Sequence, residues 1–183
     1  MKTTRTILSG AAFCALATLA IRATAMQDGL KDGTKAPAFS ASGTDGKTHS
    51  LESLSKKGPV VLYFVKIGCP VNQRAIPHFN TLSKTYKNAT MVGVINGSMD
   101  EAKKWKSQND APFTLLADAD LKIIRSYKAI YSPWAVLVKG GKVYKSLPGG
   151  SKTELTEVNK FMADAAKTKV ASLPFDGAPR GGG

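Results

Sequence analysis

The chain has 183 residues, of which 43% are hydrophobic, 8% aromatic and 21% charged. This is an ordinary globular composition, and the length suffices for one domain with its own hydrophobic core. The formal net charge is +13, but the basic residues are spread along the chain, which argues against nucleic acid as a partner. Contact between a basic surface and acidic components of a cell envelope fits this charge at least as well.

The N-terminus has the pattern of a secretory signal. Lys2 and Arg5 precede an apolar run over residues 7–21, and Ala23-Thr24-Ala25 supplies the small residues of a cleavage site. Roughly 15 apolar residues are short for a membrane span, which needs about 20. We therefore expect a signal peptide over residues 1–25, cleavage after Ala25 and export to the periplasm or the extracellular space. No stable membrane insertion is expected after cleavage.

Only one of the two cysteines is expected in the mature protein. Cys14 lies inside the predicted signal and follows Phe13, whereas a lipoprotein signal has a small residue there. Removal of Cys14 leaves Cys69 alone, so no disulfide can form within the mature chain. A single cysteine in an oxidising compartment needs an explanation.

The first part of the mature chain is predicted to be a linker over residues 26–35, followed by one domain over residues 36–168. Residues 36–42 and 47–50 flank Asp45-Gly46, a turn sequence that predicts a β-hairpin. A short helical turn is expected next, ended by Gly58-Pro59.

Residues 60–84 form the most informative stretch. Residues 60–65 (VVLYFV) are continuously apolar, which predicts a strand buried on both faces. After Gly68, a helix is predicted from about Pro70, whose missing N–H costs nothing at the first helical position, to about Tyr86. Pro77 lies inside this helix and is expected to kink it.

The remainder of the chain alternates between strand and helix patterns. We expect strands over residues 90–95, 113–116, 134–138 and 143–146, helices over residues 99–108, 118–127 and about 155–165, and a disordered tail over residues 169–183. This order predicts an α/β fold in which helices flank a central mixed sheet.

Three segments occur in the order and at the intervals of a known family. Cys69 and Pro77 have the separation of an attacking cysteine and a helix-kinking proline. Ser132-Pro133 precedes an apolar strand and a Gly-Gly turn, and Ala36-Pro37 opens the predicted hairpin. Over about residues 33–167 the chain resembles the thioredoxin-like superfamily, in its redoxin branch of AhpC/TSA and TlpA-like proteins. The resemblance implies a thioredoxin-like fold with an N-terminal β-hairpin extension.

The chain also departs from the active sites of this superfamily. Asn72 stands where a dithiol motif has its second cysteine, and Gln73 stands where Sco-type copper chaperones have theirs. Lys66 and Leu62 replace a threonine and a proline of peroxiredoxins. The catalytic arginine of peroxiredoxins is not visible near Ser132-Pro133-Trp134. No established set of active-site residues is therefore complete.

Cys69 is the predicted catalytic residue, with Lys66, Pro70 and Asn72 in support. A cysteine at a helix N-terminus is placed for a stabilised thiolate, and Lys66 would add positive potential. Such a thiolate can attack a disulfide, or be oxidised by peroxide to sulfenic acid. Without a second cysteine, an external thiol must resolve either product. The alternative is a small, buried and inert cysteine.

The resemblance implies a substrate groove formed by Ser132, Pro133 and Trp134. Pro133 would follow a cis peptide bond and face Cys69, and the backbone of Ser132 would pair with an extended substrate. Trp134 could line this groove, although a place in the core is the simpler expectation. Asn72 could donate a hydrogen bond to the sulfur or could be a solvated helix residue.

The other polar residues give little support for further chemistry. His78 lies nine residues beyond Cys69 and therefore on roughly the opposite side of the helix, so it is not expected to act as a base. His49 is expected on a strand surface and Arg74 on an exposed helix surface. Two separated histidines do not suggest a metal site, and no cofactor is predicted.

The sequence thus predicts an exported redoxin-family thiol oxidoreductase with an antioxidant role. Cys69 would act in peroxide reduction or in thiol–disulfide exchange, with an external thiol reductant or a protein thiol or disulfide as its partner. The alternative is a non-catalytic binding module that keeps the groove to recognise an extended peptide. The sequence indicates neither the substrate nor the oligomeric state.

Overall fold

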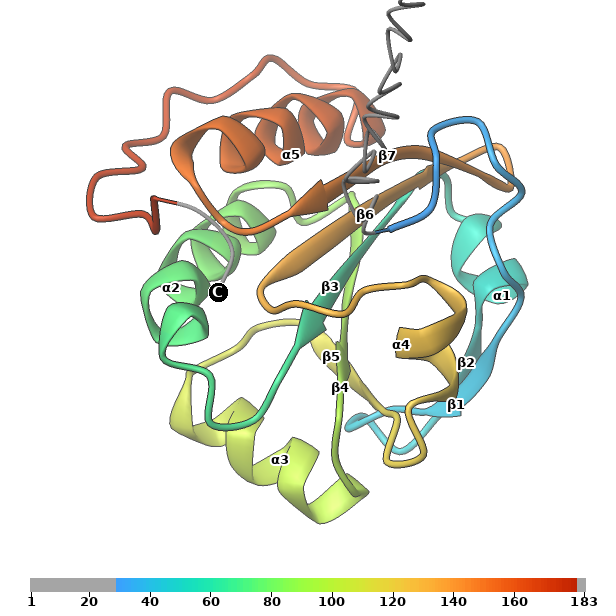
Figure 1. Cartoon of the computed structure of the whole chain (residues 1–183). Coiled ribbons are helices and arrows are strands. Elements are labelled where there is room, and N and C mark those ends of the chain that lie inside the picture. The colour runs from blue at the N-terminus through green and yellow to red at the C-terminus, as the bar shows by residue number, and fades with distance from the viewer. Residues whose placement is uncertain (1–28, 181–183) are drawn as a thin grey trace, which may run out of the picture.

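The computed structural model describes residues 29–180, so the predicted signal peptide lies outside the described residues. A five-stranded mixed sheet in the order β5-β4-β3-β6-β7 forms the centre, and a separate two-stranded hairpin joins β1 and β2 (Figure 1). The strands are β1 (Ser40–Ser42), β2 (Thr48–Ser50), β3 (Val60–Val65), β4 (Thr90–Ile95), β5 (Thr114–Ala117), β6 (Trp134–Lys139) and β7 (Lys142–Pro148). The helices are α1 (Leu51–Ser55), α2 (Pro70–Thr85), α3 (Met99–Gln108), α4 (Lys122–Ser126) and α5 (Lys152–Ala165). The predicted thioredoxin-like fold with its N-terminal hairpin is confirmed.

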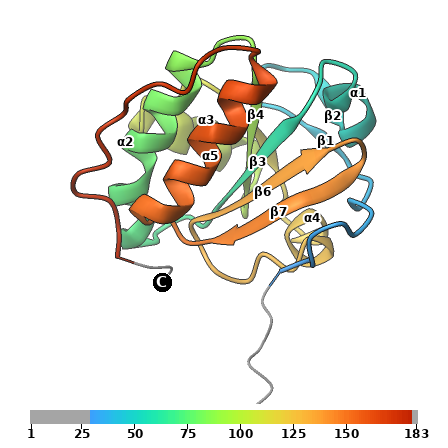
Figure 2. The same cartoon turned by 90° about the horizontal axis from the view of Figure 1, so that it is seen from above.

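Strand β3 occupies the middle of the sheet because its side chains are apolar on both faces. All six residues are buried, and the strand runs parallel to β4 and antiparallel to β6. Val61 and Tyr63 point to a first core with α2, α3 and α5, whereas Leu62 and Phe64 point to a second core with α1 and α4. Figure 2 shows these two groups of helices on opposite sides of the sheet. The alternation follows from the two-residue period of a strand.

The expected helix boundaries hold to within a turn, and the difference at α4 has a clear cause. This helix begins at Lys122 and not at Asp118, because Leu121 has a left-handed backbone (φ 60°). The two carboxylate oxygens of Asp118 accept hydrogen bonds from the N–H groups of Ile123 and Ile124 at 3.1 and 2.8 Å. The side chain of Asp118 thus satisfies donors that a longer helix would have paired internally.

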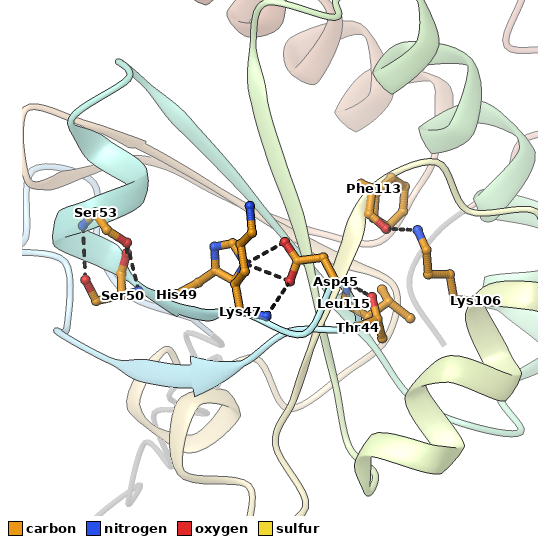
Figure 3. A network of polar contacts seen from close by, with 9 residues as sticks. All are labelled: Thr44, Asp45, Lys47, His49, Ser50, Ser53, Lys106, Phe113 and Leu115. Atoms are coloured by element: carbon orange, nitrogen blue, oxygen red, sulfur yellow. Dashed lines mark hydrogen bonds and ion pairs between the residues drawn. The ribbon is translucent and has the colours of Figure 1, made fainter.

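The N-terminal hairpin is fastened to the edge of the main sheet. Figure 3 shows His49 beside Asp45, with Nε2 3.0 Å from both carboxylate oxygens, and Thr44 Oγ1 accepting a hydrogen bond from the N–H of Leu115 at 3.1 Å. Lys106 donates to the carbonyl of Phe113 on the far side of this contact. His49 lies on β2, as expected, and its ring forms hydrogen bonds with the carboxylate of Asp45.

The described part of the expected linker, residues 29–35, is ordered against β7, which differs from the sequence expectation. Gly33 N–H donates to Val143 O at 2.7 Å, and Val143 N–H donates to Thr34 O at 2.8 Å. The side chain of Leu30 packs against the second core, which contains Leu62 and Phe64. The segment pairs backbone groups at the open edge of β7, which provides hydrogen bonds that composition does not reveal.

The expectation of a disordered tail is wrong for residues 169–180. This segment runs back along α2 in Figure 1 and Figure 2. The N–H of Ala171 donates to the hydroxyl of Tyr86 at 2.8 Å, Asn159 Nδ2 donates to Ala171 O at 2.9 Å, and the side chain of Phe175 is 4% exposed. A few apolar side chains between proline and glycine residues hold the segment without any helical or strand periodicity.

Among the described helices, none is both long and apolar enough to cross a membrane.

Candidate functional site

Cys69 stands directly before the first turn of α2. Strand β3 ends at Val65, and the chain turns through Gly68, whose positive φ of 77° is readily adopted only by glycine. Cys69 is the N-cap residue and Pro70 the first residue of the helix. As a residue, Cys69 is partly exposed. The first turn of α2 contains no acidic residue, so no carboxylate there offsets the positive end of the helix dipole beside the sulfur.

The loop before β6 faces this cysteine. The Ser132–Pro133 peptide bond is cis, and both residues are buried. The Cys69 thiol donates a hydrogen bond to the carbonyl oxygen of Ser132 over 3.3 Å. The structure thus brings together the two segments that the resemblance paired, which are 63 residues apart in the chain.

Asn72 donates no hydrogen bond to the sulfur and is not solvated, so neither sequence expectation describes it. Its side chain is fully buried. Its Nδ2 group donates to Ser132 Oγ at 2.7 Å and to Lys66 O at 3.1 Å. Asn72 therefore links the first turn of α2 to the end of β3 and to the cis-proline loop.

Tyr63 completes this buried network and is a residue that the sequence analysis missed. Its hydroxyl donates to Asn72 Oδ1 at 3.0 Å. Burial, followed by the nearby negative charge of a Cys69 thiolate, raises the pKa of Tyr63 far above its ordinary value, so the phenol remains a donor. The available signal was a tyrosine within an otherwise apolar strand, because a buried phenol needs a hydrogen-bond partner.

The hydroxyl of Ser132 lies at the centre of the network. It accepts hydrogen bonds from the N–H of Lys66 at 2.9 Å and from Asn72, and it donates to the carbonyl of Phe64 at 3.2 Å. The side chain of Lys66 is exposed, so the backbone of this residue supports the loop while its ammonium group points to solvent. Buried polar groups that are all paired hold one geometry.

Trp134 does not line the groove, which corrects the expected set of groove residues. Its side chain is 0% exposed, and its indole N–H donates to Ser146 Oγ at 3.0 Å. Tyr131 stacks on it with ring centroids 6.3 Å apart and is 41% exposed. Trp134 points into the core because it begins the buried strand β6, whereas Tyr131 belongs to the preceding loop and remains at the surface.

His78 and Arg74 take no part in this network. His78 is half-buried on α2 and meets the ring of Phe175 edge-on, with centroids 5.8 Å apart. Burial lowers the pKa of His78, and the charge of Asp176 opposes that shift in part. Arg74 is exposed, as expected.

Comparisons with known proteins show which family the chain resembles. The model of the AhpC/TSA family matches residues 33–147. A "Thioredoxin-like protein" of Haemophilus influenzae is 30% identical over 98 residues, which are 54% of this chain and 59% of that protein. "Putative peroxiredoxin bcp" of Helicobacter pylori is 32% identical over 102 residues, which are 55% of this chain and 67% of that protein.

A solved structure with the same fold is that of a "putative Thiol:disulfide interchange protein DsbE from Chlorobium tepidum". It is 25% identical with a TM-score of 0.66, and the match covers 75% of this chain and 99% of that one. The chain spans 59% and 67% of the lengths of the two sequence relatives. Because the family match covers more than half of the chain and contains Cys69, Asn72 and Ser132-Pro133, the chain belongs to the AhpC/TSA family of thioredoxin-like redoxins.

Proposed function

We propose that this protein is an exported thiol–disulfide oxidoreductase that works with one cysteine, Cys69, and an external thiol. The observation that carries the proposal is the place of the sulfur. Cys69 is a partly exposed residue directly before α2, and its sulfur is 3.3 Å from the carbonyl oxygen before the cis-proline, while a buried asparagine fills the position of a second sulfur.

The reaction begins when the Cys69 thiol loses its proton and its hydrogen bond to Ser132 O. The thiolate attacks one sulfur of a disulfide, a mixed disulfide with Cys69 forms, and the other sulfur leaves as a thiolate that takes a proton from water. An external thiol then attacks the mixed disulfide on the substrate sulfur. The electron pair returns to Cys69, and the substrate leaves as a disulfide with that thiol.

Asn72 supports an exchange that stops at the mixed disulfide until an external thiol arrives. In a dithiol site the second sulfur releases the substrate within the same chain. Asn72 has no such chemistry, and its three hydrogen bonds fix it in the network beneath Cys69. Each turnover therefore requires the external thiol.

Peroxide reduction at the same sulfur is a second candidate, favoured by the relative named as a peroxiredoxin. The thiolate would attack one peroxide oxygen, release water or an alcohol, and become a sulfenic acid. One external thiol would convert the sulfenic acid into a mixed disulfide with loss of water, and a second would restore the thiol. The threonine and arginine expected for efficient peroxide reduction are absent from the predicted positions, so we rank this activity second.

The test is intact-mass analysis of the mature chain after treatment with glutathione disulfide or with hydrogen peroxide. We expect one glutathione adduct per chain, at Cys69, that excess glutathione removes, and a slower oxidation by peroxide. The Cys69→Ser variant should form neither product. If Cys69 forms no adduct and remains unoxidised, the proposal is wrong and the cysteine is inert.

Export rests on the sequence pattern of residues 1–25. N-terminal sequencing of the protein recovered from the periplasm or the medium should begin at Met26. Recovery of the full-length chain in the cytoplasm alone would contradict export without affecting the proposed chemistry.

A further inference from the structure

A cavity of about 280 Å³ lies against the same loop that receives the Cys69 hydrogen bond. Ser132 and Lys66 form the part of its wall nearest the cysteine. The rest of the wall comes from the end of β3, from Asn96 after β4, from α4 with the residue before it, and from the segment before the cis peptide bond. The full lining is Phe64, Val65, Lys66, Asn96, Leu121, Ile124, Arg125, Ala129, Ile130, Tyr131 and Ser132.

The walls of this cavity are mainly apolar. Leu121 and Ile124 contribute from α4 and the residue before it, and Ala129 and Ile130 from the following segment. Ile130 is 53% exposed although its side chain is large and apolar. An apolar concavity with exposed hydrophobic side chains at its mouth is the usual form of a small-molecule site.

The charged residues of the lining are cationic. Lys66 and Arg125 both belong to it, both are exposed, and no acidic side chain belongs to it. Within residues 29–180 neither of these cations forms an ion pair. The acids near α4 are engaged elsewhere, because Asp118 accepts from the backbone of that helix and Asp120 pairs with Lys122.

We propose that this cavity binds the non-sulfur part of a small thiol, or of its disulfide, that has an apolar body and a carboxylate. This inference rests on the proposed function and specifies its external thiol. The apolar body would lie against α4, and the carboxylate would lie near Lys66 and Arg125. Cys69 is not itself a lining residue, so the sulfur of the ligand would lie at the end of the cavity formed by Ser132, whose carbonyl oxygen is 3.3 Å from the sulfur of Cys69.

The volume favours a small ligand. Drug-sized ligands occupy sites of about 300–1,000 Å³, so a cavity of about 280 Å³ holds one compact group and not a folded segment of protein. The cationic lining adds selectivity, because an opposite charge accelerates association and a like charge slows it.

The chemistry uses two small thiols for each disulfide that Cys69 reduces. The first attacks the mixed disulfide on the substrate sulfur, donates its proton to water and returns the electron pair to Cys69. The second attacks the disulfide so released, displaces the substrate as a thiol and leaves a disulfide of two small thiols. Cys69 can also react with a small disulfide directly, because its thiolate forms a mixed disulfide with one sulfur while the other sulfur leaves as a thiolate, and this exchange provides a direct assay.

The experiment measures the rate at which Cys69 of the mature chain forms a mixed disulfide with each of two aromatic disulfides. One probe is dithiobis(nitrobenzoate), which is anionic, and the other is dithiodipyridine, which is neutral. We expect the ratio of the anionic to the neutral rate to fall roughly threefold in Arg125→Gln, the scale of one partly exposed ion pair. Ile130→Glu, which adds a carboxylate at the mouth, should lower the ratio by at least as much, and added salt should weaken both effects.

Arg74→Gln is the matched control. It removes the same charge from α2, close along the chain to Cys69 but outside the cavity lining, and should leave the ratio unchanged. An unchanged ratio in both cavity variants overturns the inference. An equal fall in the reaction rates of both probes also overturns it, because the substitution would then have changed the reactivity of Cys69 itself.

Two further outcomes separate this inference from the proposed function. If Cys69 reacts with both probes but without charge selectivity in the wild type, the proposed function stands and the cavity assignment fails. If Cys69 reacts with no disulfide, both the proposed function and the assignment of the cavity to a small thiol are wrong. A charge-selective reaction found only with a protein disulfide would assign the cavity to a protein partner and overturn the small thiol.

Discussion

Asn72 occupies the first turn of α2 three residues after Cys69, where a dithiol site has its second sulfur. In this protein Asn72 has a structural role. Its amide joins Tyr63, Ser132 and the backbone of Lys66 in a buried network. We therefore expect a change at Asn72 to affect both the proposed chemistry of the site and the stability of the cis-proline loop.

Asn72→Cys should convert the site into a dithiol. The chain would then carry a second thiol three residues after Cys69, and a disulfide between the two should form under oxidation, which thiol counting by mass spectrometry detects. The cost is an unpaired Tyr63 hydroxyl and a lost donor to Ser132, so the free energy of unfolding should fall by about 1–3 kcal/mol. Denaturant unfolding of the reduced protein measures this loss.

Asn72→Ser is the control for that variant, because its side chain is also small but contains no sulfur. It should lose stability without gaining a second reactive thiol. A stable Asn72→Cys protein that never forms the internal disulfide would contradict the proposed geometry of the first turn.

Tyr63→Phe tests the network without altering the cysteine or its neighbours in the chain. It removes the donor to Asn72 Oδ1 and leaves a buried acceptor unpaired. We expect a loss of about 1–2 kcal/mol in the free energy of unfolding. Urea titration measures the loss. A variant as stable as the wild type would show that the Tyr63 hydroxyl makes no net contribution to the free energy of unfolding.

At the scale of elements, α2 contacts two segments that are neither helix nor strand, in addition to α5 and the sheet. Its first turn meets the cis-proline loop, and its middle meets residues 169–180, where Phe175 packs edge-on against His78. The histidine is thus separated from the chemistry and belongs to the contact with the C-terminal segment.

This contact should weaken in acid. Burial lowers the pKa of His78 below its ordinary value of 6.5. The attached segment therefore favours the neutral ring, whereas His78 takes up a proton more readily when the segment is detached. Neutral His78 therefore stabilises the attached segment fully above pH 6.5. This stabilisation is lost as the pH falls from 6.5 through the lower pKa of His78 in the folded protein. Hydrogen exchange of residues 170–180, corrected for intrinsic rates, should rise between about pH 7.5 and about pH 5.

His78→Gln provides the comparison for this pH effect, because the amide does not titrate. Its exchange in the same segment should show no such rise. A rise of equal size in wild type and variant would mean that a group other than His78 is responsible.

At the scale of the whole molecule, both ends of the described chain belong to the domain. Residues 29–35 pair with β7, and residues 169–180 cover α2 and contact α5 through Asn159. Strand β3 separates two cores, and each terminal segment adds apolar side chains to one of them, Phe175 to the first and Leu30 to the second.

Phe175→Ala should therefore destabilise the whole domain and not only its end. The side chain is 4% exposed, and we expect a loss of about 2 kcal/mol, below the usual cost for a buried phenylalanine because the segment can partly detach. Denaturant unfolding measures it, and Leu173→Ala, at a partly buried neighbour, should lose less. An unchanged unfolding curve for Phe175→Ala would show that the segment contributes no net stability.

The sequence by itself determined the architecture. The apolar run of β3, the glycine turn at Gly68 and the proline at the start of α2 are local signals, so strand, turn and helix could be predicted with the cysteine between them. The order of the later elements then predicted the mixed sheet. The local signals failed at the two ends of the domain, because residues 29–35 and 169–180 have no periodicity and are ordered only by what they touch.

Only the tertiary structure decided what surrounds the sulfur. Asn72 could equally have been a solvated residue, and its burial depends on Tyr63 and Ser132, which lie 9 and 60 residues away in the chain. Trp134 could have lined the groove, and its place in the core depends on β7, where Ser146 accepts its indole N–H. Hydrogen bonds and cavity walls bring together residues that are distant in sequence, and the periodicity of the sequence does not predict them.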